Sequence, residues 1–346
     1  MKKVTFVTGR LGGGGSERVL TLIANQMRRD GYEVSIISFS GNANEYDNAC
    51  NVIYLNQMNN IYLVIKLRET IKSLDPDVLI AFEYHVGMKT ILAAVGLSVK
   101  MIVSERNDPH ELDAQKAKKV LRDVLYRKLD CLVCQTPDAR AYFAPEIRKK
   151  AIIIGNPIKS DLPDWVGQNS NVLVNYCRLE KQKNLPMLIK AFELVKKKHP
   201  EVILEIYGEG NEEKKLRNLI EDNNLEANVK LSAFSSQIHQ IASKAYAFVS
   251  SSDYEGISNS MLEAMAIGRP VICTDCPIGG ARMVIQDEIN GKLIPVGDYE
   301  KMGASICEII DDKKKAIQMA TKAKEIRYKY SVGKIVRMWE KCIEAL

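Results

Sequence analysis

Residues 246–274 read YAFVSSSDYEGISNSMLEAMAIGRPVICT, and this stretch decides the fold most clearly. The apolar run at its start predicts a buried strand that ends near Ser251. A loop of small polar residues follows, and then an apolar helix that ends before Gly268, a residue suited to the position after a helix. Residues 270–274 predict a second strand. A strand, a helix and a strand in this order are typical of a parallel sheet.

The same alternation runs through all 346 residues. Strands are predicted near residues 3–8, 32–39, 52–55, 77–82, 100–104, 130–135, 151–154, 172–177, 202–207, 229–231, 245–250, 270–274 and 292–295. Helices are predicted near 16–30, 60–74, 86–96, 113–128, 137–143, 184–198, 211–223, 237–244, 260–267, 279–285, 298–311, 313–327 and 333–346. Continuous apolar strands between amphipathic helices predict an α/β protein with parallel sheets covered on both faces.

A polar, proline-containing stretch near residues 159–171 interrupts this pattern once. We therefore predict two doubly wound, Rossmann-like domains, at 1–160 and 172–328, joined by a linker at 161–171 and followed by a helical segment at 329–346. Ligands of open α/β sheets bind beyond the carboxyl ends of the strands. The prediction is an interdomain cleft lined by loops of both domains.

Composition excludes several classes of protein. No run of eighteen apolar residues exists that could span a membrane, and the apolar start of the chain is too short for a signal peptide. We expect a cytoplasmic protein. The eight cysteines include Cys131-x-x-Cys134 and Cys273-x-x-Cys276, but these pairs lie far apart with no nearby histidine. Reduced structural cysteines are favoured over zinc ligands.

The net charge of +6 is concentrated in one predicted helix, residues 116–128. Its cations are Lys116, Lys118, Lys119, Arg122, Arg127 and Lys128. Apolar residues Val120, Leu121, Val124 and Leu125 lie between them at helical spacing. Such a helix can lie on an anionic membrane surface, or it can pack its apolar side in the core. No aromatic platform accompanies the cations, which argues against nucleic-acid binding.

A glycine-rich turn, Gly9-Arg10-Leu11-Gly12-Gly13-Gly14-Gly15-Ser16, links the first strand to a helix. Such a turn brings backbone N–H groups close to a negative ligand. The G-x-G-x-x-G spacing fails, because the third glycine of a pattern that includes Gly14 would fall at position 17, which is Glu17. The second strand also ends without the acidic residue that would bind a ribose. These departures weaken the alternative of an NAD-dependent oxidoreductase.

Charged residues follow two strands of the second predicted domain. Arg178 and Lys183 come after the strand at 172–177, where cations would stabilise the charge of a departing diphosphate. Glu255 lies in a Gly/Ser/Asn loop, where a carboxylate is either solvated or functional. Glu263 has a structural alternative, because Ser260-x-x-Glu263 has the spacing of a capping box.

Together and in order, these features resemble glycosyltransferase family 4, retaining enzymes of the GT-B fold that include bacterial surface-polysaccharide and lipid-linked glycan transferases. The resemblance covers the whole chain. It rests on the glycine loop 13–18, the pair Asn156-Pro157, the cations Arg178 and Lys183, and the motif Glu255-x7-Glu263.

The resemblance implies a role for each matching position. Arg178 and Lys183 would hold the donor diphosphate, Glu263 the ribose, and Glu255 the transferred sugar, so that Glu255, Arg178 and Lys183 are the expected catalytic residues. Other implied donor contacts are Gly13, Gly14 and Gly15 from the first domain, with Gly256, Ser258, Asn259 and Ser260. The segment 329–346 would cross back to the first domain.

The sequence departs from the family at one position. Many relatives have a histidine where this chain has Arg106, after the strand at 100–104. His85 and His110 lie in nearby loops. We expect contacts to the sugar or the acceptor from His85, Arg106 and Asn156.

The activity implied is a hexosyltransferase that needs no metal or other cofactor, because the departing phosphate oxygen can accept the acceptor proton. It would move a hexose or N-acetylhexosamine from a UDP-sugar to a lipid-linked saccharide in polysaccharide or glycan biosynthesis. The basic helix would then face the inner side of the cell membrane, as in a peripheral protein. A non-catalytic two-domain sugar-binding protein is a further alternative, but that class is typically exported.

Overall fold

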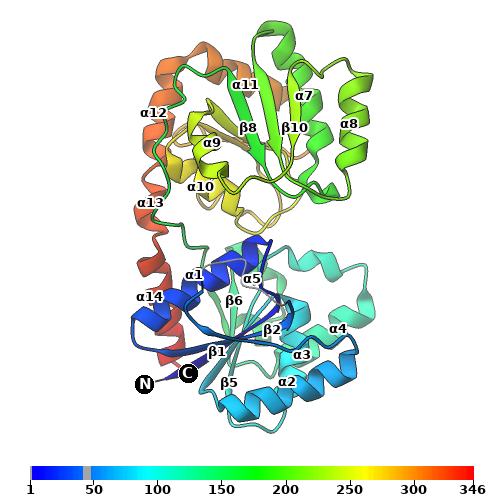
Figure 1. Ribbon diagram of the computed structural model, residues 1–346, viewed down its shortest axis with the longest axis vertical. Coiled ribbons are helices and arrows are strands. Elements are labelled where there is room, and N and C mark those ends of the chain that lie inside the picture. The colour runs from blue at the N-terminus through cyan, green and yellow to red at the C-terminus, as the bar shows by residue number, and fades with distance from the viewer. Residues whose placement is uncertain (1, 42–47) are drawn as a thin grey trace. The chain divides into compact units, whose positions relative to one another are not determined.

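The computed structural model describes residues 2–41 and 48–346. The chain divides into two compact units, each built around its own sheet (Figure 1). Unit 1 runs to Pro157 and takes in Tyr330–Leu346, whereas unit 2 comprises Ile158–Lys329. The chain therefore passes from one unit to the other twice.

In the described residues, unit 1 has a seven-stranded parallel sheet of order β3-β2-β1-β4-β5-β6-β7. Its strands are β1 (Lys3–Arg10), β2 (Glu33–Ser40), β3 (Asn51–Tyr54), β4 (Val78–Phe82), β5 (Lys100–Ser104), β6 (Cys131–Cys134) and β7 (Ala151–Ile153). The order reverses between β1 and β4, as in a doubly wound sheet. β4 and β6 are buried along their whole length, which fits their unbroken apolar sequences.

Helices connect these strands. They are α1 (Gly15–Arg29), α2 (Asn60–Leu74), α3 (Tyr84–Ala94), the 3-10 turn η1 (Pro109–Leu112), α4 (Lys116–Tyr126), α5 (Pro137–Tyr142) and α6 (Pro145–Arg148). The C-terminal helix α14 (Val332–Glu344) packs beside α1 (Figure 1). Its Trp339 is fully buried and stacks on Phe82 at the end of β4, with ring centroids 6.0 Å apart. The last helix thus completes the core of unit 1.

Unit 2 repeats the architecture with a parallel sheet of order β10-β9-β8-β11-β12-β13. Its strands are β8 (Val172–Tyr176), β9 (Ile203–Tyr207), β10 (Val229–Ser232), β11 (Ala247–Ser250), β12 (Val271–Thr274) and β13 (Lys292–Ile294). Its helices are η2 (Lys181–Lys183), α7 (Leu185–Lys198), α8 (Glu213–Asp222), α9 (Ile238–Lys244), α10 (Asn259–Ile267), α11 (Tyr299–Asp311), α12 (Lys313–Ala323) and α13 (Ile326–Lys329). The predicted class, two Rossmann-like α/β domains, is confirmed.

The stretch 161–171, expected as a linker, is part of unit 2. Trp165 is buried, and its indole N–H donates to the carbonyl of Ala245 at 2.8 Å. The backbone N–H of Trp165 donates to Ile267 at 3.0 Å, and that of Val166 to Ser243 at 2.9 Å. One large apolar side chain anchors an otherwise polar segment.

The helix predicted at 279–285 is wrong, because this segment forms hydrogen-bonded turns. Gly279 has a φ of 76°, which no right-handed helix allows. A side chain at Gly280 would overlap the backbone carbonyl of Gly256. The turns bring the two loops into close contact, and glycine permits the approach.

Helix α4 packs on the core of unit 1 through Leu125, Tyr126 and Arg122, so the core-packing interpretation holds for Leu125 but not for the rest of the apolar row. Val120, Leu121 and Val124 keep 62%, 47% and 49% of their surface exposed. Arg122 is instead fully buried, with its guanidinium 5.1 Å and 5.0 Å from the ring centres of Tyr142 and Phe143. Cation–π contacts and a 2.8 Å ion pair with Asp123 compensate for burying that charge.

Candidate active site

The candidate site of unit 2 lies where the strand order reverses. β8 and β11 are neighbours at this point and run parallel, so the loops after them leave the same edge of the sheet. The first loop carries Arg178 and Lys183, and the second carries Glu255. Open α/β sheets bind ligands at such reversals. The fold thus brings together residues that are more than 70 positions apart in the sequence.

Lys183 and Glu255 form an ion pair between these loops, and their side chains are only 13% and 16% exposed. The Ser252 hydroxyl donates to Glu255 Oε1 at 2.9 Å, and the Gln182 amide donates to Oε2 at 3.4 Å. Burial lowers the pKa of Lys183, but the Glu255 carboxylate more than offsets it and the net shift is upward. Lys183 therefore remains a cation at neutral pH.

Side-chain hydrogen bonds fix the two loops to one another. Asn184, in a left-handed conformation with φ of 42°, donates from its side chain to Asp253 at 2.7 Å. The Ser251 hydroxyl lies 2.9 Å from the carbonyls of both Lys183 and Asn184. These contacts hold the segment that carries Lys183 against the segment that carries Glu255.

The backbone of Glu255 is held from the other side by the turn after β12. Its N–H donates to the carbonyl of Pro277 at 2.8 Å, and its own carbonyl accepts from Ile278 at 3.2 Å. The Glu255 carboxylate therefore has a fixed position on a loop with no regular secondary structure.

Helix α10 begins directly after this loop. Its N-cap is Ser258, whose hydroxyl accepts from the backbone of Met261 at 3.4 Å. The capping box expected from Ser260 and Glu263 is wrong, because the N-cap is Ser258, two residues before Ser260. The first turn of α10 directs its backbone N–H groups and its positive dipole end toward the preceding loop, Gly256–Ser258. This is a favourable place for a phosphate.

Glu263 is buried within α10 and pairs with a residue that sequence reasoning missed. Its Oε2 lies 3.0 Å from Nε2 of His239, which belongs to α9. His239 lies 24 positions earlier in the chain, and no local motif marks it. Only the packing of α9 against α10 reveals the pair.

Arg178 differs from Lys183 in its surroundings. Its residue is exposed, and no carboxylate of the described residues lies within ion-pair distance of its guanidinium. The two predicted phosphate contacts thus consist of one buried, paired cation and one solvated cation.

In unit 1, the glycine loop leads into α1 as predicted, with Gly14 as its N-cap. A side chain on Gly14 would overlap the carboxylate of Glu17, so a residue larger than glycine cannot be accommodated here unless Glu17 moves. His85, at the start of α3, lies against Gly9, and its Nδ1 is 3.4 Å from Glu83. Burial, with smaller effects from Lys89 and Lys118, lowers the pKa of His85.

Arg106 and Asn156, two of the expected acceptor contacts, lie side by side in unit 1. Arg106 Nη1 donates to Asn156 Oδ1 at 2.9 Å, and the Gln135 amide donates to the same oxygen at 2.6 Å. His110 lies in η1, where its Nδ1 is 2.6 Å from Asp108. Of Arg106 and His110, only Arg106 is hydrogen-bonded to Asn156.

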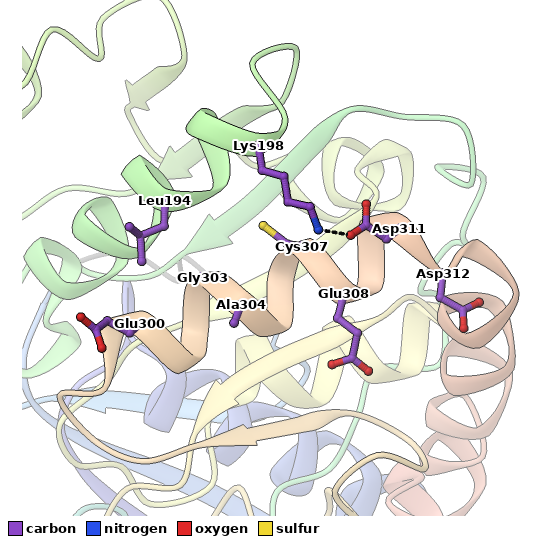
Figure 2. A pocket seen from close by; sticks show the side chains of 9 residues that line it. All are labelled: Leu194, Lys198, Glu300, Gly303, Ala304, Cys307, Glu308, Asp311 and Asp312. Carbon is purple, nitrogen blue, oxygen red and sulfur yellow. Dashed lines mark hydrogen bonds and ion pairs between the residues drawn. The ribbon is translucent and has the colours of Figure 1, made fainter.

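A surface hollow of about 830 Å³ lies elsewhere in unit 2, between α7 and α11 (Figure 2). It is lined by Leu194, Lys198, Glu300, Gly303, Ala304, Cys307, Glu308, Asp311 and Asp312. Lys198 and Asp311 form an ion pair across it, and none of the predicted site residues reaches it. In the described part of the chain, no group of three or more His, Cys, Asp or Glu is placed to hold a metal ion.

Comparison with known proteins agrees with this architecture. Residues 13–162 match the model of "Glycosyltransferase Family 4", and residues 165–326 match that of "Glycosyl transferases group 1". These two models together cover most of the chain, which is therefore a glycosyltransferase, and the solved structures that it resembles have the GT-B fold. It belongs to glycosyltransferase family 4.

Two curated relatives cover nearly the whole chain. An uncharacterized glycosyltransferase of Haemophilus influenzae is 26% identical over 98% of this chain and 99% of its own length. The N-acetylgalactosamine-N,N'-diacetylbacillosaminyl-diphospho-undecaprenol 4-alpha-N-acetylgalactosaminyltransferase of Campylobacter jejuni is 25% identical, with 97% and 98% covered. Among solved structures, Anabaena HepE in complex with UDP-glucose aligns with a TM-score of 0.87 at 19% identity, covering 100% of both chains.

Proposed function

We propose that this protein transfers a hexose or N-acetylhexosamine, with retention of configuration, from a UDP-sugar to a lipid-linked saccharide. The observation that carries the proposal is the cluster at the reversal point of unit 2. The loops at this edge of the sheet carry the Lys183–Glu255 pair, the exposed Arg178 and the N-terminus of α10. Cations beside a buried carboxylate suit a ligand with a diphosphate next to hydroxyl groups.

Each residue has a proposed part in the reaction. Arg178 and Lys183 bind the diphosphate and stabilise the charge that grows as the sugar leaves. The first turn of α10, from Ser258 to Ser260, donates backbone hydrogen bonds to the phosphates. Gly13–Gly15 are proposed to approach the donor with their backbone groups.

The two glutamates serve the hydroxyl groups of the donor. Glu263, held by His239, accepts from the ribose, and Glu255, held by Ser252 and Lys183, accepts from the transferred sugar. Neither acts as the base, because the departing phosphate oxygen takes the proton of the acceptor. With two protein cations at the diphosphate, the reaction is proposed to need no metal. Arg106, Asn156 and His85 are proposed to contact the sugar or the acceptor.

The comparisons support the choice of substrates. Anabaena HepE, the solved structure quoted above, was crystallised with UDP-glucose. The Campylobacter relative is named for an undecaprenol-linked acceptor. These names make UDP-sugars and polyprenyl-diphosphate saccharides the first compounds to test.

The test is a panel of UDP-sugars with polyprenyl-diphosphate saccharide acceptors, read by mass spectrometry. We expect one UDP-sugar to extend an acceptor by the mass of one hexosyl or N-acetylhexosaminyl unit. UDP should bind in titration calorimetry whereas NAD should not. Binding of NAD with hydride transfer would support the oxidoreductase alternative, and UDP-sugar binding without turnover would support a non-catalytic sugar-binding protein.

Helix α4 is proposed to hold the protein on an anionic membrane surface, where a lipid-linked acceptor resides. The support is the exposed apolar row Val120, Leu121 and Val124, flanked by exposed Lys116, Arg127 and Lys128. Within the described residues, no helix is long and apolar enough to cross a membrane.

Vesicle sedimentation tests this contact. We expect the protein to bind phosphatidylglycerol vesicles more tightly than phosphatidylcholine vesicles, and the triple change Val120→Ser, Leu121→Ser, Val124→Ser to weaken binding. Val166→Ser, at a residue 65% exposed in unit 2, is the matched control. Undiminished sedimentation of the triple variant would refute the assignment to α4.

A further inference from the structure

The guanidinium of Arg106 is held on two sides but is only partly hydrogen-bonded. Its centre lies 4.5 Å from the Phe82 ring and 5.8 Å from the Trp339 ring, so two elements of unit 1 support it: β4 and the C-terminal helix α14. Nη1 donates to Asn156, whose oxygen is also bound by Gln135. The rings and the amides fix the plane of the cation.

The remaining donors of this cluster have no partner among the described residues. They are Nε and Nη2 of Arg106, and nearby the indole Nε1 of Trp339. The Ser104 hydroxyl, two residues before Arg106, is also buried and unpartnered. Buried N–H groups are almost always bonded in native proteins, so several together require an explanation.

The unpartnered atoms of Arg106 are informative as a pair. Nε and Nη2 lie on one edge of the guanidinium, and this edge matches the two oxygens of a carboxylate or phosphate with parallel hydrogen bonds. Nε and Nη2 of Arg106 can only donate. Their complement is a group that only accepts and carries negative charge.

The position of Arg106 agrees with a ligand site. It follows β5 at the carboxyl edge of the unit 1 sheet, where open α/β sheets bind ligands. Burial lowers the pKa of Arg106 to about 9, and only Glu83 acts in the opposite direction. The environment therefore disfavours the charge that the side chain carries, and an anion would restore its stability.

We infer that Arg106 binds an oxyanion of the acceptor through its Nε–Nη2 edge. This inference rests on the proposed transferase function and specifies the class of its acceptor, a saccharide that carries a phosphate or carboxylate. Two sources share this chemistry: the diphosphate of a lipid carrier and the carboxylate of an acidic sugar. Trp339 and Phe82 are positioning residues, because they hold the plane of the guanidinium.

The test uses the full chain with saturating UDP, so that the cations of unit 2 are occupied. Binding of methyl phosphate, methyl glucuronide and neutral methyl glucoside is compared by NMR titration. We expect one of the two anions to bind about tenfold more tightly than methyl glucoside, the effect of one charge-assisted hydrogen bond. A preference for methyl phosphate indicates the carrier diphosphate, and a preference for methyl glucuronide indicates an acidic sugar.

Variants assign the preference to this edge. Arg106→Gln should abolish it, and Arg106→Lys should reduce it because lysine keeps the charge but lacks the paired donors. Arg148→Gln, at an exposed cation of unit 1, is the matched control and should change nothing.

Equal binding of all three probes by the native protein, or a preference that survives in Arg106→Gln, would overturn the inference. UDP affinity is measured in the same samples. Failure of the native protein to bind UDP would instead count against the proposed function, so the two failures can be told apart.

Discussion

Lys183 contacts Glu255 directly, so a cation expected at the diphosphate and an acid expected at the sugar form one buried pair. The position of each charge depends on the other. A ligand whose phosphate binds to Lys183 therefore also acts on Glu255, the group proposed to contact the transferred sugar.

Removal of Lys183 should destabilise the protein as well as weaken UDP binding. Lys183→Met leaves Glu255 buried without its counter-charge, and breaking a buried pair in this way costs about 3 kcal/mol. The double variant Lys183→Met/Glu255→Gln should recover most of this loss without recovering UDP affinity. Urea unfolding and calorimetry measure the two effects.

Arg178→Met is the control for that experiment. Because Arg178 is exposed and outside any ion pair with a described carboxylate, its removal should weaken UDP binding while the free energy of unfolding stays within about 0.5 kcal/mol. Equal stability of Lys183→Met and the native protein would contradict a structural role for the pair.

Glu255→Gln should slow sugar transfer about 100-fold or more while UDP still binds. The amide keeps the size of the side chain but removes the charge that orients the sugar, and losses of this order follow removal of one electrostatic contact in an active site. Turnover of the UDP-sugar found in the panel measures it. Glu226→Gln, an exposed acid of the same unit, should leave the rate unchanged; native turnover in Glu255→Gln would refute the role.

Stability should fall between about pH 4.5 and pH 7 because of Glu105. Burial raises the pKa of this glutamic acid to about 7, although hydrogen bonding to Tyr126 and the charge of Arg122 lower it. In this range the unfolded chain loses the proton and the folded protein keeps it, so rising pH favours unfolding. The shift in pKa corresponds to a loss of about 3 kcal/mol in the free energy of unfolding across this range. Above pH 7 this contribution no longer changes with pH.

Glu105→Gln should remove that part of the pH dependence, which urea unfolding at several pH values can show. Tyr126→Phe is a second probe. The Tyr126 hydroxyl donates to Glu105 at 2.6 Å and lowers the pKa of Glu105, so its loss should extend the upper end of the window to higher pH. An identical pH profile in Glu105→Gln and the native protein would show that other groups cause the dependence.

Transfer should continue in the presence of EDTA. Arg178 and Lys183 are proposed to supply the positive charge that a divalent cation would otherwise supply at the diphosphate. The measurement is the initial rate before and after chelation, with manganese added back. Activity that is lost to EDTA and restored by manganese would overturn the metal-free proposal.

Most of the fold follows from the sequence because buried parallel strands leave a strong signal. β4, read as VLIAF, and β6, read as CLVC, are unbroken apolar runs between helical patterns, and each lies where it was predicted. The failures are at residues whose structure depends on distant contacts. Trp165 ties the expected linker to unit 2, and Gly280 meets Gly256 in a turn where local pattern favours a helix.

The sequence indicates which residues lie at the candidate site, but not which of their side chains contact one another. Loop position after a strand indicates Arg178, Lys183 and Glu255, since carboxyl ends of neighbouring strands share an edge. No local pattern shows that Lys183 faces Glu255, or that Glu263 meets His239 from another helix. Side-chain pairings of this kind depend on how helices and loops pack on the sheet.

The C-terminal helix α14 determines the order in which the two units can mature during synthesis. Trp339 fills the core of unit 1, yet it leaves the ribosome only after every residue of unit 2 has been made. Unit 2 can complete its sheet and helices while unit 1 still exposes the apolar surface around Phe82. During synthesis, unit 1 therefore lacks part of its core until α14 has been translated.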